Sequence, residues 1–176
     1  MAKTNKELNE EKWALILLRY LNNKGCDYAI ADLNIPNNFS DVDVCAKSES
    51  EKYDPLYIQL CLDVEPNNEG FEKIIIGDIK AHTFNNCDNE LGAIEGKIKK
   101  YIKQSKDFTN ITLAVQSIGS YFIDDDENYK IKHLIDSCKK IEEKYKYAGF
   151  FKDVYLLSQK GEICDGQKIQ GDPERV

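Results

Sequence analysis

The sequence has few of the features by which common catalytic classes are recognised. It contains two histidines, neither in a catalytic-triad pattern, and it has no glycine-rich loop of the kind that holds nucleotide phosphates. Six cysteines are present, but none forms a C-x-x-C pair or stands near a histidine at zinc-ligand spacing. We therefore expect no nucleotide-binding loop and no structural zinc site, and we expect the cysteines to be reduced thiols in the core.

Long apolar runs are also missing. The longest run, Trp13 to Leu18, ends at Arg19 and is far shorter than the roughly 20 residues that cross a bilayer. The basic amino terminus has no apolar stretch followed by a cleavage site, so we expect a cytoplasmic protein. A chain of 176 residues fits one domain, expected over residues 1–164, with a frayed tail over residues 165–176.

An excess of positive charge is absent, because 24 Lys and Arg against 31 Asp and Glu give a net charge of −7. A globally acidic protein must supply a local basic patch or a metal to bind nucleic acid. Lysines that meet this need gather in one segment: Lys97, Lys99, Lys100, Lys103 and Lys106. Two interpretations stand: Lys99, Lys100 and Lys103 contact nucleic acid, or the segment is a solvated helix face.

Hydrophobic periodicity predicts an α/β protein with a central mixed β-sheet flanked by helices. Helices are expected over residues 6–23, 90–104 and about 127–147, the last after an acidic turn at 124–127. Strands are expected over residues 42–46, 57–64, 71–77, 110–116 and 153–158. Gly25 is expected to end the first helix, and the later strand-helix-strand crossovers are expected to be right-handed.

Two neighbouring strands carry the side chains with the clearest chemical potential. Asp41 and Asp43 lie at the start of one strand, and Gln59 and Cys61 alternate along the next. Alternating residues on adjacent strands share a face and stand close together, and many Mg²⁺-dependent nucleases assemble a metal site from an acid and a polar pair placed in this way. If both acids lie on one face, their proximity favours a bound cation or a raised pKa of one carboxyl. The other interpretation is an ordinary start of a strand with one solvated acid.

With these residues in place, the chain resembles the restriction-endonuclease-like superfamily, the PD-(D/E)XK nucleases. The element order from Lys6 to about Gln116 is similar to the αβββαβ core of that superfamily, here with an added C-terminal helix and strand. The segments 20–25 and 41–46 look like the helix end and the "acid-I-D-L-I-A" strand of small Holliday-junction-resolvase-like members. The segment 57–61 falls where those proteins carry E-V-K.

The resemblance implies specific roles. Asp43 would be the metal-binding aspartate, Asp41 a second acid, and Gln59 would stand at the second-ligand position, with Mg²⁺ or Mn²⁺ as cofactor. Cys61 replaces the lysine that orients the attacking water, and a thiol supplies no fixed positive charge.

Three residues outside the two strands offer replacements. Lys97, on the border of the second helix's apolar stripe, is a candidate for the relocated catalytic cation. Glu10 or Glu11 on the first helix is a candidate for an additional carboxylate. The competing interpretation is that Lys97 is an ordinary surface lysine and that Glu10 and Glu11 only stabilise the first helix through its dipole.

Two functions follow from the sequence. The first is a divalent-metal-dependent hydrolase of DNA phosphodiesters, with weakened or lost catalysis left open. The second is a catalytically inactive protein on the same scaffold, of the inhibitor or immunity type, which engages a basic protein partner through its acidic surface. The oligomeric state stays open, a homodimer included.

Overall fold

A six-stranded sheet organises the computed structural model, which describes residues 5–32, 42–62, 88–117, 128–160 and 163–170. The described helices are α1 (Asn5–Asn23), α3 (Asp88–Lys103) and α4 (Asn128–Tyr145). The strands are β1 (Tyr28–Asp32), β2 (Val44–Ser48), β3 (Leu56–Leu62), β4 (Ile111–Ser117), β5 (Asp153–Lys160) and β6 (Ile163–Gln170). The predicted class, a mixed sheet flanked by helices, is confirmed.

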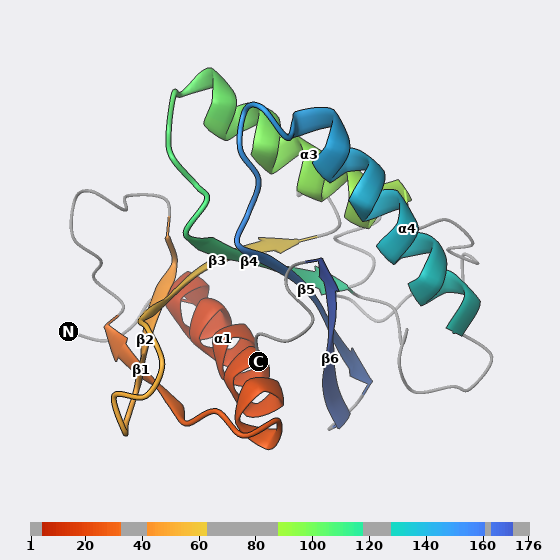
Figure 1. Cartoon of the computed structure of the whole chain (residues 1–176). Coiled ribbons are helices and arrows are strands. Elements are labelled where there is room, and N and C mark those ends of the chain that lie inside the picture. The colour runs from red at the N-terminus through yellow and green to blue at the C-terminus, as the bar shows by residue number, and fades with distance from the viewer. Residues whose placement is uncertain (1–4, 33–41, 63–87, 118–127, 161–162, 171–176) are drawn as a thin grey trace.

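The strands lie side by side in their order along the chain. β1, β2 and β3 form an antiparallel meander, β3, β4 and β5 are parallel, and β6 returns antiparallel to β5. Each parallel step needs a crossover, and α3 and α4 lie in these two connections. Both helices lie on one face of the sheet, and α1 lies on the other (Figure 1).

Each face of the sheet has its own buried cluster. On the α1 face, side chains of α1 pack on Val44, Ile58 and other residues of the sheet that point the same way. On the opposite face, Ile94 and Ile98 of α3 pack on Leu113, and both isoleucines are fully buried. Alternation along each strand therefore decides which helix layer a side chain meets.

The first helix begins and ends close to the predicted bounds. Gly25 has a φ of +101°, and the Cys26 N–H reaches back to the Leu21 carbonyl at 3.2 Å, so the glycine ends α1 as predicted. The buried stripe of α1 consists of Ala14, Ile16, Leu17, Leu18 and Leu21, and Trp13 and Tyr20 pack at its margin.

Two strands depart from the predictions. The frayed tail predicted over residues 165–176 is wrong for residues 165–170, because β6 covers Ile163–Gln170 and Ile169 is 2% exposed; residues 171–176 lie outside the described residues. Its Asp, Gly, Gln and Lys residues disfavour a strand, but pairing with β5 outweighs local propensity. β1 was not predicted; it has five residues, two of them alanines. The strand predicted at 71–77 and the acidic turn at 124–127 lie outside the described residues.

The described cysteines match the expectation of reduced thiols. Cys26, Cys45 and Cys138 are buried, Cys61 is partly buried, and none of these four thiols forms a disulfide. Burial raises the pKa of the Cys138 thiol to about 12, which keeps it protonated and unreactive at neutral pH. None of the described helices is both long enough and apolar enough to cross a membrane.

Candidate functional site

The candidate site lies where β2 and β3 stop pairing. Their ladder joins Val44–Ala46 to Leu56–Ile58, and the Asp43 N–H donates to the Ile58 carbonyl at 2.9 Å. The next N–H on that side of β3, from Leu60, donates instead to Asp43 Oδ2 at 2.7 Å. Asp43, immediately before β2, thus satisfies a strand N–H that the ladder leaves open.

Gln59 connects this carboxylate to the helix layer above it. Its Nε2 donates to Asp43 Oδ2 at 2.5 Å and to the Leu60 carbonyl at 2.9 Å. Its Oε1 accepts a hydrogen bond of 2.9 Å from the Tyr101 hydroxyl of α3. Gln59 is 5% exposed and Tyr101 is 1% exposed, so the network is shielded from water and ties β2, β3 and α3 together.

Burial sets the electrostatics of Asp43. Desolvation raises the pKa of its carboxyl from 3.8 to about 6, and the hydrogen bond from Leu60 opposes this shift. Glu10 raises the same pKa, whereas Lys97 and Lys6 lower it. Glu10 is held by Lys6 at 3.3 Å. The side chains suggested as replacements, Glu10 from α1 and Lys97 from α3, therefore act electrostatically on Asp43.

The other predicted site residues lie elsewhere. Cys61 shares the α3 face with Gln59, but its Sγ points to the Ala93 carbonyl at 4.0 Å. Glu11 lines a groove on the outer side of α1 with Lys12 and Arg19. Asp41 lies outside the described residues.

The lysines of α3 form an ion-pair network around one carboxylate. Glu95 accepts a hydrogen bond of 2.6 Å from Lys144 and one of 2.7 Å from Tyr145, and its carboxylate is 3.4 Å from the Lys99 ammonium. These contacts lower the pKa of Glu95 to about 2, so a negative charge persists among the lysines. Lys100 and Lys103 are exposed at the end of the same helix.

The arrangement around Asp43 does not fit a divalent cation. A site built from the aspartate, the Gln59 side chain and a backbone carbonyl needs oxygen atoms turned toward one point. Instead, the Gln59 amide nitrogen bonds both Asp43 Oδ2 and the Leu60 carbonyl, while the amide oxygen faces Tyr101. Within the described ranges, no three His, Cys, Asp or Glu side chains gather as a metal site would require.

Two residues that take part in these contacts were not predicted from the sequence: Tyr101 of the Asp43 network, and Glu95 of the ion-pair network on α3. A tyrosine inside a buried stripe is itself a signal, because its hydroxyl needs a hydrogen-bond partner there. Glu95 carries a weaker signal, the (i, i+4) spacing to Lys99.

Comparisons with protein-family models, with curated proteins and with solved structures found no match to this chain.

The raised pKa of Asp43 predicts a specific pH dependence of stability. The folded state holds this proton more tightly than the unfolded chain, so the contribution to stability is present below about pH 4 and is lost as the pH rises to about 6. In Asp43→Asn, the unfolding free energy is expected to fall by about 2 kcal/mol less than in the wild type as the pH rises through this range. Urea unfolding at a series of pH values measures the difference.

Asp27 is the matched control for this experiment. Hydrogen bonds from Ser48 and Ser50 lower the pKa of Asp27, so its contribution is present at neutral pH and is lost on acidification. Asp27→Asn should therefore alter the pH profile with the opposite sign. Identical profiles for wild type and Asp43→Asn would contradict the burial of the Asp43 charge.

Proposed function

We propose that this chain is a PD-(D/E)XK-like protein that has lost phosphodiester hydrolysis and functions by binding a partner. The order α1-β1-β2-β3-α3-β4, with Asp43 beside Gln59 of the next strand, supports the scaffold. The observation that carries the loss of hydrolysis is the Gln59 amide. Its NH₂ group bonds the two oxygens, from Asp43 and Leu60, that a cation would otherwise bind.

The charge of the chain favours a basic protein as the partner. The net charge is −7. The Glu95 carboxylate also lies among the lysines of α3 that would have to contact a nucleic-acid backbone, and it pairs with Lys99 and Lys144. The loop between β2 and β3 carries Glu49, Glu51 and Asp54 exposed to solvent. An acidic surface steers association with a basic face, and the binding should weaken as salt increases.

Metal binding and cleavage by designed variants test the loss of hydrolysis. Calorimetry with Mn²⁺ and nicking of double-stranded, single-stranded and branched DNA are expected to give no signal for the wild type. The variant Gln59→Glu with Cys61→Lys returns a carboxylate and a fixed cation to β3, and it is expected to gain measurable Mn²⁺ affinity. Metal-dependent cleavage by the wild type that disappears in Asp43→Ala would overturn the proposal.

A second candidate, hydrolysis with relocated residues, is favoured by one specific observation. Glu10 and Lys97 both act electrostatically on Asp43, and Lys97 has no ion-pair partner within the described part of the chain. If this candidate holds, Lys97→Ala abolishes wild-type cleavage. Lys12→Ala, at an exposed position on the outer side of α1, should leave such cleavage unchanged.

A further inference from the structure

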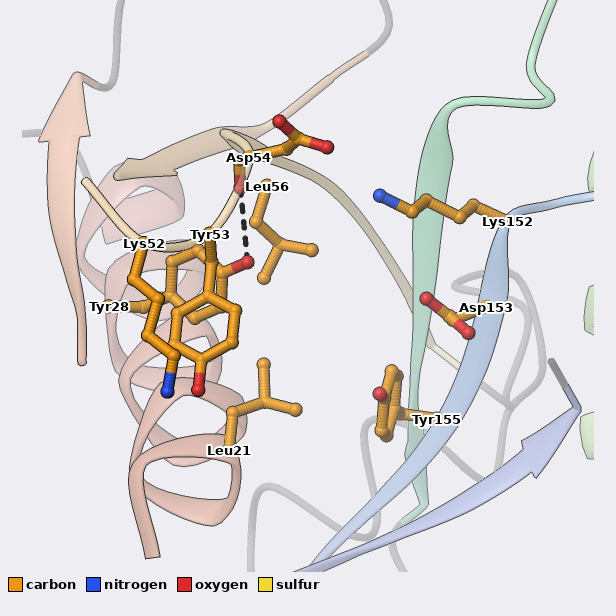
Figure 2. Close-up of a pocket in the computed structure, with 9 residues that line it drawn as sticks. All are labelled: Leu21, Tyr28, Lys52, Tyr53, Asp54, Leu56, Lys152, Asp153 and Tyr155. Carbon is orange, nitrogen blue, oxygen red and sulfur yellow. Dashed lines mark hydrogen bonds between the residues drawn. The ribbon is translucent and has the colours of Figure 1, made fainter. Parts of the chain in front are cut away.

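A cavity of about 250 Å³ lies away from the Asp43 network, on the α1 face of the sheet. It opens between the last turn of α1, β1, the loop from β2 to β3 and the start of β5 (Figure 2). Nine residues line it: Leu21, Tyr28, Lys52, Tyr53, Asp54, Leu56, Lys152, Asp153 and Tyr155. Its volume suits a small organic molecule rather than a macromolecular segment.

One side of the cavity is aromatic and fixed in place. The rings of Tyr28 and Tyr53 lie 5.8 Å apart. Their hydroxyls donate to the backbone carbonyls of Asp54, at 3.0 Å, and Gly25, at 3.1 Å. Because both hydroxyls are engaged, the rings offer apolar surface to a ligand at low conformational cost. Leu21 and Leu56 extend this apolar wall (Figure 2).

The β5 side supplies hydrogen-bond donors. Figure 2 shows Lys152 extending from this side toward the loop, with Tyr155 below it on the same side of the cavity. In the residues that the structure describes, neither the Lys152 ammonium nor the Tyr155 hydroxyl has a protein acceptor. Burial raises the pKa of Tyr155, so its hydroxyl keeps its proton and serves as a donor.

Two acids line the cavity, and neither reverses this donor character: the Asp54 carboxylate is exposed to solvent, which screens its charge, and Asp153 is paired. Asp153 lines the same side, but its carboxylate is 2.8 Å from the Lys168 ammonium, and both side chains are largely buried. The rings are also already used by cations: Lys52 lies 5.1 Å from the centre of the Tyr53 ring, and Lys168 lies 5.8 Å from that of Tyr155. A cationic ligand would compete with these lysines.

We propose that this cavity binds a small organic anion. Its planar body lies against Tyr28 and Leu56, and its carboxylate or phosphate oxygens accept hydrogen bonds from Lys152 and Tyr155. The site is separate from the Asp43 network: Leu21, which lines the cavity, is about 16 Å along α1 from Glu10. The proposal therefore does not depend on whether the scaffold hydrolyses phosphodiesters.

Titration of the ¹⁵N-labelled full chain tests the proposal with defined probes: phenyl phosphate, benzoate, inorganic phosphate and benzyltrimethylammonium. Phenyl phosphate or benzoate is expected to shift the amide resonances of cavity residues saturably, and the tighter of the two identifies the anionic group. Inorganic phosphate lacks the planar body and should bind at least about tenfold more weakly than phenyl phosphate. Tighter binding of benzyltrimethylammonium, or no saturable shift with either organic anion at about 10 mM, would overturn the proposal.

Two substitutions assign the donors. Tyr155→Phe keeps the ring and removes the hydroxyl, and Lys152→Met keeps the aliphatic stem and removes the charge; each should weaken anion binding about tenfold or more. Lys12→Met, on the outer side of α1, should not change it. The same spectra report whether each variant is folded. If Lys152→Met is not folded, the test rests on Tyr155→Phe, which is the less disruptive change. Unchanged affinity in a folded Tyr155→Phe variant would contradict the assigned geometry.

Discussion

The Gln59→Glu variant is expected to lose about 3 kcal/mol of unfolding free energy at pH 8. In the wild type, the Gln59 amide nitrogen donates to Asp43 Oδ2 at 2.5 Å, in a site that is largely shielded from water. Glutamate would place a second carboxylate against the first, and two buried carboxylates in contact cannot both ionise without a large penalty. Urea denaturation at pH 8 measures the loss.

The same variant should regain stability under two conditions. At about pH 5 the pair shares a proton, so one carboxyl donates to the other and most of the loss disappears. At pH 8, Mn²⁺ at about 100 times its dissociation constant should restore about 2.7 kcal/mol, because a cation replaces the missing donor.

A surface substitution of the same chemistry provides the control. Gln104→Glu, at an exposed position just after α3, should change the unfolding free energy by less than about 0.5 kcal/mol at either pH. Wild-type stability of Gln59→Glu at pH 8 without metal would contradict the role assigned to the amide. Recovery at pH 5 without recovery in Mn²⁺ would contradict the nuclease ancestry of the site.

The sequence predicted that Asp43 and Gln59 would meet because strand pairing is governed by simple rules. An apolar alternation marks each strand, and the antiparallel ladder of β2 on β3 places Val44 opposite Ile58. The residue before Val44 and the residue after Ile58, Asp43 and Gln59, are therefore brought together. The orientation of the amide was not predictable in this way. It depends on the Tyr101 hydroxyl, which comes from a helix 42 residues further along the chain.

The cavity on the α1 face could not be predicted from the sequence for a related reason. Its lining comes from four separate segments, and no spacing in the chain connects Leu21 or Tyr28 with Lys152. One of those segments, β1, was itself missed, because Tyr28-Ala29-Ile30-Ala31-Asp32 offers little apolar alternation. Long-range packing, rather than local pattern, creates this site.

The last strand provides the second large expected effect. Ile169→Ala is expected to lower the unfolding free energy by about 3 kcal/mol. Ile169 is 2% exposed and joins the cluster on the α4 face, although a register shift removes it from direct pairing with β5. The irregularity turns the isoleucine into the core, so truncation leaves a cavity there. Urea denaturation of the full chain measures the loss.

Ile102→Ala is the matched control for this measurement, because Ile102 is 37% exposed on α3 and should cost less than about 1 kcal/mol when truncated.

A second variant tests the other face of β6. A side chain at Gly166 would place its Cβ 3.1 Å from Leu157 Cδ2 and 3.3 Å from Tyr20 Cγ, so Gly166→Val should also destabilise the fold. Small effects of both Ile169→Ala and Gly166→Val would mean that the last strand is only loosely attached. Large effects of both would show that α1 and α4 hold β6 between them, so that residues 163–170 belong to the folded domain.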